Sequence, residues 1–177
     1  DEIIDERILQ PLGMDNTYFN VPAEYKSLRV NIKDRDMSRF LDRPPTKYFS
    51  ASGGLTSSAE DYLRFEQMLL NGGELFGNRL LSPRSVRMMS SNQIGGLYKS
   101  FSRQQEGMGF GYTVAVTLDP ITSNARRSAG AFGWGGAFGT RSWTDPEEEL
   151  TAVIMLQQAY GAAQYDFENA VQQAIVE

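Results

Sequence analysis

The hydrophobic positions of this chain follow helical spacing in its first half and alternate in its second half. Helical spacing recurs near the start and in two later segments that carry their own start and stop signals. From Gly109 onward the apolar positions change to a period of two, which is typical of β-strands. The pattern predicts an α+β fold, with a helical and loop-rich region over residues 1–107 and an antiparallel sheet with a final helix over 108–177.

The first helix is indicated by four apolar residues near helical spacing, Ile3, Ile4, Ile8 and Leu12. We expect it to end at Gln10, because a proline disfavours helix in the residue before it. Since this pattern is already under way at Asp1, we expect the chain to be part of a longer protein.

The second helix carries the clearest signals in the sequence. Ser57 and Glu60 form a predicted capping box, and the sequence Asn-Gly-Gly at 71–73 ends the helix, since glycine readily adopts the left-handed C-cap. The predicted buried stripe consists of Tyr62, Phe65 and Leu69. A third helix is predicted from the N-cap Ser82 and Pro83 to about Ser91, with Val86 and Met89 facing inward.

Residues 20–50 are polar and contain three prolines, with only weak periodicity. We expect a long loop lying over the body of the protein. A loop of this length is more often a lid or a functional loop than an idle connection.

The second half predicts about four antiparallel strands flanked by helices. The alternating residues Phe110, Tyr112, Val114 and Val116 predict one strand, and a glycine-rich pair of strands follows over roughly 128–135 and 139–144. A fourth strand over 150–156 is more continuously apolar than the others, which predicts burial on both faces. The acidic run at 145–149 is interpreted as a solvated turn. A final amphipathic helix is predicted from Phe167, Val171, Ala174 and Ile175.

Composition excludes several classes of chemistry. The 177 residues include no histidine and no cysteine, so a Ser-His-Asp triad, disulfides and the commonest zinc ligands are all ruled out. The formal net charge of -5 and the lack of a basic run argue against binding to nucleic acid or anionic membranes. No apolar stretch approaches the ~20 residues of a membrane-spanning helix. We predict no metal and no cofactor.

The stretch from Ser128 to Pro146 is unusually rich in glycine, with an aromatic residue, Trp134, in its centre. Glycine weakens a strand, because it has no side chain to pack and loses more backbone entropy on folding. Two interpretations remain open. The glycines either accommodate the bulky Phe132, Phe138 and Trp143 in a hairpin, or they form a pocket wall whose backbone N–H groups face a substrate carbonyl.

The search for a nucleophile within the chain finds none. The sequence contains no G-x-S-x-G, no S-x-x-K, no P-loop and no G-x-G-x-x-G motif. The segment Tyr18-Phe19-Asn20 matches Y-x-N, a pattern that is common by chance. A pair of catalytic carboxylates stays open as a minor alternative, although nothing in the sequence places two of them in one pocket.

The chain resembles the carboxy-terminal part of the serine β-lactamase-like hydrolases, which include class C β-lactamases, D-alanyl-D-alanine carboxypeptidases and family VIII carboxylesterases. The resemblance covers nearly the whole chain. Four blocks in the family's order carry it, namely Ile8–Met14 with Thr17 and Phe19; Ser52–Ser57 through Asp61 and Phe65; Asn71–Gly73 to Leu80–Ser82; and Gly133–Gly136 through Gly139 and Thr140 to Trp143, Asp145 and Pro146.

The resemblance implies where the site residues lie. Family members use the serine of S-x-x-K as nucleophile and the tyrosine of Y-x-N in the acid-base step, and both motifs precede the first block, so we expect them upstream of Asp1 and reject Tyr18. The third motif, K-T-G or an equivalent, corresponds to Trp134-Gly135-Gly136 here, a form more like the esterase branch. Ala137 follows it and is the implied backbone oxyanion donor.

Two further expectations come from the resemblance. Gly53 stands where class C enzymes commonly carry an aromatic residue that packs on the substrate, so we expect a more open pocket there. Trp134 replaces the lysine that contacts the substrate carboxylate in the lactamases, which should favour neutral esters over penicillin-like acids. The family is often exported, although a cytoplasmic location is equally compatible with the sequence.

These observations favour part of a serine hydrolase that acts through an acyl-enzyme on an ester, β-lactam or D-alanyl amide. The alternative is a non-catalytic module that binds a ligand or peptide along the glycine-rich strand. Under the first hypothesis the partners are a small-molecule substrate and the missing upstream segment. If the chain folds alone, we expect homo-oligomerisation or poor solubility, because sheet surface would stay exposed. If a serine of this chain is nonetheless activated, Ser50, Ser52 and Ser128 are the first candidates.

Overall fold

The computed structural model describes residues 1–32, 47–50, 53–98, 106–158 and 161–176. Its helical segments are α1 (Glu2–Ile4), the π-helical turn η1 (Asp5–Leu9), α2 (Gln10–Leu12), the 3-10 helices η2 (Ala23–Leu28) and η3 (Gly95–Leu97), α4 (Ala59–Leu70), α5 (Pro83–Met89), α7 (Pro120–Ser123) and α8 (Ala162–Gln173). Its strands are β1 (Glu74–Leu75), β2 (Asn78–Arg79), β3 (Met108–Phe110), β4 (Ala115–Thr117), β5 (Phe132–Gly135), β6 (Arg141–Asp145) and β7 (Leu150–Ile154).

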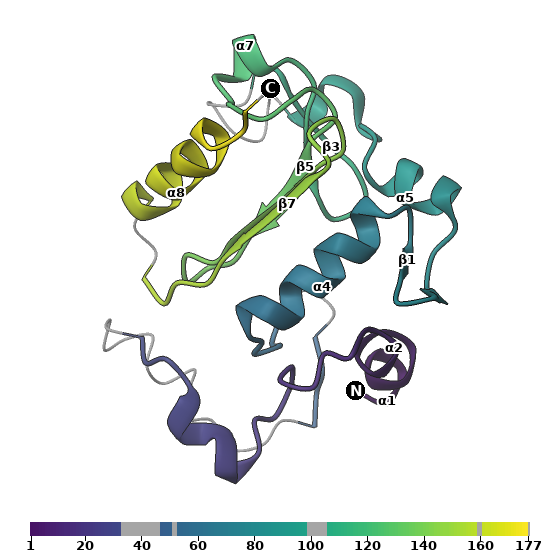
Figure 1. Ribbon diagram of the computed structural model, residues 1–177, viewed down its shortest axis with the longest axis vertical. Helices are drawn as coiled ribbons and strands as arrows, with labels where there is room; N and C mark the ends of the chain where they lie inside the picture. Colours follow the sequence, from purple (N-terminus) through teal and green to yellow (C-terminus); the bar gives the residue numbers. More distant parts are fainter. Residues whose placement is uncertain (33–46, 51–52, 99–105, 159–160, 177) are drawn as a thin grey trace.

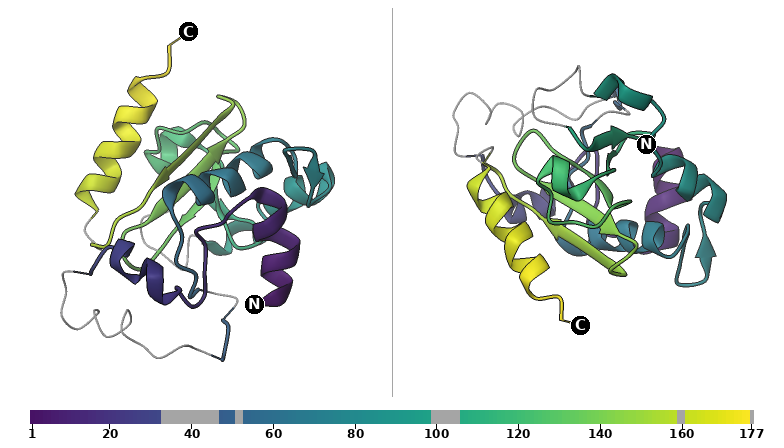
Figure 2. Two further views of the ribbon diagram at one scale, coloured as in Figure 1. Left: turned by 60° about the horizontal axis from the view of Figure 1, so that its bottom comes forward. Right: turned by 90° about the horizontal axis from the view of Figure 1, so that it is seen from above.

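A five-stranded antiparallel sheet forms the centre of the molecule, in the order β3-β4-β5-β6-β7. Helix α4 lies against one face of this sheet and α8 lies against the other (Figures 1 and 2). Strands β1 and β2 form a separate antiparallel hairpin after α4. The predicted α+β class is confirmed, with one more strand in the main sheet than expected.

The additional strand arises within the alternating segment that was predicted to be a single strand. Residues 108–117 fold instead into the hairpin β3–β4, in which Phe110 pairs with Ala115. The chain reverses at Gly111 to Val114, where Thr113 adopts φ +70°. Gly111 packs so closely on the carbonyl oxygen of Met89 that an added Cβ would lie 1.9 Å from it. The alternation of apolar with small or polar residues continues across this turn, so the sequence pattern did not reveal it.

Strand β7 was predicted to be buried on both faces, and this was wrong. β7 is an edge strand with β6 as its neighbour in the sheet, and of its five residues only Ala152 is buried. Contacts with α4 and α8 shield the strand partially from both sides. Its apolar sequence thus reflects two half-covered faces rather than a central position.

The first helix does not end at Gln10. Gln10 adopts right-handed helical angles (φ -60°, ψ -48°), and the helix continues through Pro11 to Leu12. The turn before the proline is a wider π-helical turn, in which the N–H of Gln10 donates to the carbonyl of Asp5. Gly13 then ends the helix in the left-handed conformation, φ +62°.

Helix α4 begins one residue later than the predicted capping box. Ser58 is the N-cap, and its hydroxyl accepts from the N–H of Asp61 at 3.1 Å. The hydroxyl of Ser57 instead lies 2.7 Å from that of Thr17. Helix α5 begins at Pro83 after the N-cap Ser82, as predicted.

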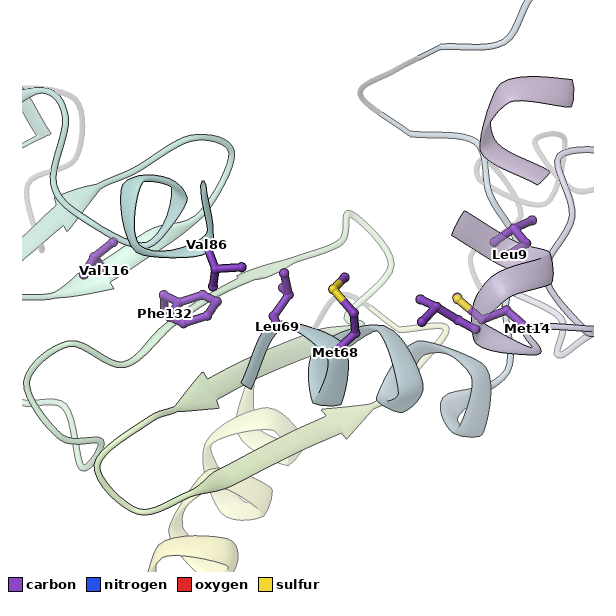
Figure 3. Packing of buried hydrophobic residues seen from close by; sticks show 8 residues of the cluster. Leu9, Met14, Met68, Leu69, Val86, Val116 and Phe132 are labelled. Atoms are coloured by element: carbon purple, nitrogen blue, oxygen red, sulfur yellow. The ribbon is translucent and has the colours of Figure 1, made fainter. Parts of the chain in front are cut away.

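The hydrophobic core lies where the first helix and α4 meet α5 and the sheet (Figure 3). Its buried members are Leu9, Leu12, Met14, Met68, Leu69, Val86, Val116 and Phe132. Of the three residues in the predicted buried stripe of α4, Leu69 is buried, whereas Tyr62 and Phe65 are partly exposed. Ile3 at the start of the chain is also exposed.

The described part of the segment predicted as a long loop, residues 20–32 and 47–50, contains the short helix η2, which lies on the side of the N-terminal end of α4 (Figure 1). Residues 33–46 of this prediction lie outside the described residues. The final helix is confirmed as α8. Within the described part of the chain, no helix combines the length and apolarity that crossing a membrane requires.

Candidate functional site

The β5–β6 hairpin carries the predicted third motif. Trp134 pairs with Ser142 and Gly135 with Arg141, and the N–H of Gly136 then donates to the carbonyl of Thr140 at 2.9 Å. The turn itself consists of residues 137–139, of which Gly139 has φ +94°. A glycine in this left-handed position is characteristic of three-residue hairpin loops. The hairpin therefore presents its tip as a tight, defined turn.

The glycines of the hairpin are required mainly by the hairpin itself. A Cβ at Gly133 would lie 2.1 Å from the carbonyl oxygen of Ser142, and one at Gly136 would lie 2.2 Å from Oγ1 of Thr140. At Gly135 the nearest atom would be 3.3 Å away. Gly133 and Gly136 are thus required by the close backbone of β6 and the side chain of Thr140, not by the bulky aromatic residues, while residues 134–137 are exposed.

Ala137 occupies the position that the sequence assigns to the oxyanion donor. Its residue surface is exposed, and its backbone N–H donates to no group within the described parts of the chain. The neighbouring N–H groups of Gly136 and Gly139 are both satisfied inside the turn. Within the described residues, the turn therefore uses the N–H groups on either side of Ala137 and leaves that of Ala137 unused.

Trp134, three residues before Ala137, ends a row of three aromatic rings. Its ring meets Phe110 edge-on at 5.2 Å between centroids, and Phe110 contacts Tyr98 at 5.4 Å. Tyr98 is buried, whereas 52% of the Trp134 surface is exposed. Contact with Phe110 from β3 supports the Trp134 ring at the surface, so it offers an apolar face without a cation.

Gly53 is exposed and lies on a different segment, between η2 and α4. A Cβ added there would meet nothing within 4 Å, which means that the hairpin does not pack against this side of it. Trp134, Gly135, Gly136 and Ala137 are thus contiguous at the end of β5, while Gly53 lies on another segment beside open space. Ser52 lies outside the described residues.

The remaining candidates have local roles. The N–H of Ser128 donates to Oδ2 of Asp145 at 2.9 Å, and its hydroxyl donates to Glu148 at 3.4 Å. Asp145 is fully buried in β6, so the prediction of a solvated acidic turn holds only for the residues after it. The hydroxyl of Tyr18 donates to the carbonyl of Asp15 in a local turn, and burial raises the pKa of Tyr18.

Sequence reasoning missed a buried carboxyl group under the hairpin. Glu66 of α4 is 4% exposed and accepts hydrogen bonds from the hydroxyls of Ser142 at 2.6 Å and Thr144 at 2.7 Å. Burial raises the pKa of Glu66, and the two hydroxyl bonds oppose this rise. The available signal was its spacing, because Glu66 lies four residues after Tyr62 and three before Leu69, within the predicted stripe.

No group of three or more acidic, histidine or cysteine side chains gathers into a metal-binding arrangement in the described residues. The geometry that remains is a backbone donor beside an aromatic surface. Such a site can orient a carbonyl compound and polarise its oxygen.

A family model described as Beta-lactamase matches residues 1–176. This chain belongs to the β-lactamase family. Among its relatives, an uncharacterized protein of Mycobacterium tuberculosis is 37% identical over 171 residues, which cover 88% of this chain and 43% of that protein. Esterase EstB of Burkholderia gladioli is 27% identical over 181 residues, covering 89% of this chain and 44% of the esterase.

Several solved structures share the fold of this chain. The hydrolase EstCE1, described as having promiscuous acyltransferase activity, matches with a TM-score of 0.73 at 20% identity over 97% of this chain and 49% of its own. Simvastatin synthase from Aspergillus terreus matches with a TM-score of 0.78 at 17% identity over 100% of this chain and 51% of its own. The chain spans about half the length of the relatives that it matches.

Proposed function

We propose that this chain forms the substrate-binding part of a serine hydrolase that cleaves uncharged esters through an acyl-enzyme. The observation that carries the proposal is the N–H of Ala137, which no described group accepts, three residues after the exposed Trp134. Family membership and the likeness to Esterase EstB support it. The S-x-x-K serine and lysine and the Y-x-N tyrosine would come from sequence upstream of Asp1.

The proposed reaction divides between the two parts of the protein. The upstream serine oxygen attacks the ester carbonyl, the alcohol leaves with a proton, and water then releases the acid and restores the serine. Negative charge develops on the carbonyl oxygen in both steps, and the N–H of Ala137 donates to it together with the N–H of the nucleophile. Trp134 contacts the apolar part of the substrate.

The open edge of β7 is the surface where the upstream segment would complete the sheet. The strand has β6 on one side, and its other edge leaves backbone groups unpaired by any described strand. An unpaired edge favours pairing with another chain. We therefore expect the isolated chain to form oligomers, whereas a monodisperse monomer in light scattering would contradict this.

The first test is intact mass after incubation with a fluorophosphonate, for the 177-residue chain and for the protein extended upstream. We expect a single adduct on the extended protein and none on the isolated chain. An adduct on the isolated chain would show that one of its own serines is activated, and peptide mapping would begin with Ser50, Ser52 and Ser128. Absence of an adduct and of ester hydrolysis in the extended protein would favour the non-catalytic binding module.

The neutral-ester preference is tested by restoring a cation with Trp134→Lys. We expect the variant to lose activity toward a p-nitrophenyl ester and to gain acylation by a penicillin, because the ammonium group attracts the penicillin carboxylate. Tyr112→Lys is the matched control, since Tyr112 is 53% exposed and Trp134 is 52% exposed. Equal changes in both variants would mean that the preference for neutral esters does not depend on Trp134.

A further inference from the structure

The buried acid under the hairpin is joined to the strand that supports the proposed oxyanion donor. The two oxygens of Glu66 accept from two different residues of β6, Ser142 and Thr144, which lie on the same face of that strand. Burial raises the pKa of Tyr62, one turn earlier in α4; the charge of Glu66 raises it as well, and the nearby hydroxyl of Ser142 lowers it. Helix α4 is thereby fastened to β6 by directional bonds.

The two bonded residues of β6 lie opposite the residues that lead into the site. Ser142 pairs with Trp134, and Thr144 pairs with Phe132. Between them Gly133 lies so close to the backbone of β6 that no Cβ fits. A shift or rotation of β6 would therefore be transmitted to β5, and through Gly136 and Thr140 to the turn that holds Ala137.

Packing alone does not explain an acid at this position. Its neighbours on α4, Met68 and Leu69, belong to the hydrophobic core, and an apolar residue would fill the same space. A buried carboxyl group carries a desolvation cost that only its hydrogen bonds offset. Each oxygen of Glu66 accepts one of the two hydrogen bonds. Together these bonds fix the position of β6 along α4 and its rotation, whereas apolar contacts would let the strand slide along the helix.

We propose that Glu66 is a positioning residue, which holds β6 through Ser142 and Thr144 so that the hairpin keeps the N–H of Ala137 directed at the substrate carbonyl. This inference rests on the proposed function of the hairpin. It predicts that loss of the clamp affects the transition state more than substrate binding, because the oxyanion develops only during reaction.

The test compares Glu66→Leu and Glu66→Gln in the full-length protein that carries this chain. Glu60→Gln is the matched control, because Glu60 is an exposed acid on the same helix, paired with Arg64. Active sites are counted with a fluorophosphonate, and kcat and KM for p-nitrophenyl butyrate are measured per active site. Counting separates a positioning defect from simple unfolding, which lowers the number of sites but not the rate at each site.

We expect Glu66→Leu to lower kcat per site at least about tenfold while KM changes less than about threefold. Glu66→Gln keeps one acceptor oxygen and should fall between Glu66→Leu and the unchanged control. Hydrogen exchange should accelerate at the amides of residues 132–141 in Glu66→Leu. If that variant does not fold, Thr144→Val removes one of the two bonds at nearly constant volume and should show a smaller effect of the same kind.

Wild-type kcat per site together with wild-type exchange in the hairpin would overturn the inference. If the unsubstituted protein neither hydrolyses the ester nor forms an adduct, the proposed function fails separately. Hydrogen exchange then decides whether Glu66 holds the hairpin: unchanged exchange in the variants overturns the clamp, and faster exchange confined to residues 132–141 supports it.

Discussion

Two buried glutamates approach strand β6 from opposite faces of the sheet, and their partners differ in kind. Glu66 of α4 accepts only from hydroxyl groups within the described residues. Glu168 of α8 faces two guanidinium groups, with Arg127 at 2.9 Å and Arg141 at 3.5 Å. The two side chains are almost equally buried, with 4% and 6% exposed surface. The two acids are therefore buried to nearly the same extent, and they differ in the groups that offset the cost of burial: hydroxyls for Glu66 and guanidinium cations for Glu168.

The α8 face is organised around charge. The guanidinium of Arg127 makes two bonds to Glu168 and also lies 5.2 Å from the ring centroid of Trp143. Burial lowers the pKa of Arg141, as does the nearby charge of Arg127, while Glu168 raises it. Removing the acid from such a cluster leaves two cations facing each other, whereas removing Glu66 leaves only neutral hydroxyls.

Glu168→Ala should have the largest effect on stability. It leaves Arg127 buried without its counter-charge, and breaking a buried ion pair from one side costs about 3–5 kcal/mol. Urea unfolding followed by tryptophan fluorescence measures this loss. Glu147→Gln, at an exposed turn, is the control and should change stability little.

If Glu168→Ala were no more destabilising than its control, the two faces of the sheet would not differ in this way. Replacing Arg127, Arg141 and Glu168 together by apolar residues should restore stability, because well-packed apolar side chains often substitute for a buried ion cluster without loss. That result would show that the cluster as a whole adds little net stability on this face.

Glu66→Ala should have an intermediate effect. It leaves the hydroxyls of Ser142 and Thr144 in a buried site without their acceptor, and an unsatisfied buried polar group costs about 1–3 kcal/mol. The same unfolding experiment measures it. A double-mutant cycle with Ser142→Ala isolates the bond itself, and additive effects of the two substitutions would mean that the bond contributes nothing.

The sequence predicted the helices and the hairpin where local signals are strong. Ser82 with Pro83 fixes the start of α5, and the glycines after α4 fix its end, because caps and left-handed turns depend on neighbouring residues alone. The turn at Thr113 was missed because alternating residues on both sides of it imitate one strand. The continuation of the first helix through Pro11 was missed. The residue before a proline disfavours helix, but here a wider π-helical turn precedes Pro11 and the helix continues.

The candidate site was predictable only where it follows a motif. Trp134 to Ala137 were named from the sequence because they are contiguous and resemble a known strand motif. The clamp was not, because Glu66 and Ser142 are 76 positions apart and only the packing of α4 on β6 brings them together. A lone acid in an apolar stripe was the available signal, and by itself it says nothing about its partner.

The smallest expected effect is a difference in pH dependence between wild type and Glu66→Gln. Burial raises the folded-state pKa of Glu66 above its ordinary value of 4.5. The unfolded chain therefore releases this proton at lower pH than the folded protein, and in that window the folded state binds more protons. Stability must then fall as pH rises from about 4.5 through the folded-state pKa, and level off above it.

Glutamine does not titrate, so the free energy of unfolding of wild type minus that of Glu66→Gln should decrease across this window. Urea unfolding of both proteins at intervals from about pH 4 to about pH 8 measures the difference, in which the contributions of the other carboxyl groups cancel. A difference that rises with pH would mean that the two hydroxyls stabilise the ionised form of Glu66 by more than burial disfavours it. The acid on the α4 face would then be held as a charge, like its counterpart on the α8 face, and the contrast between the two faces would disappear.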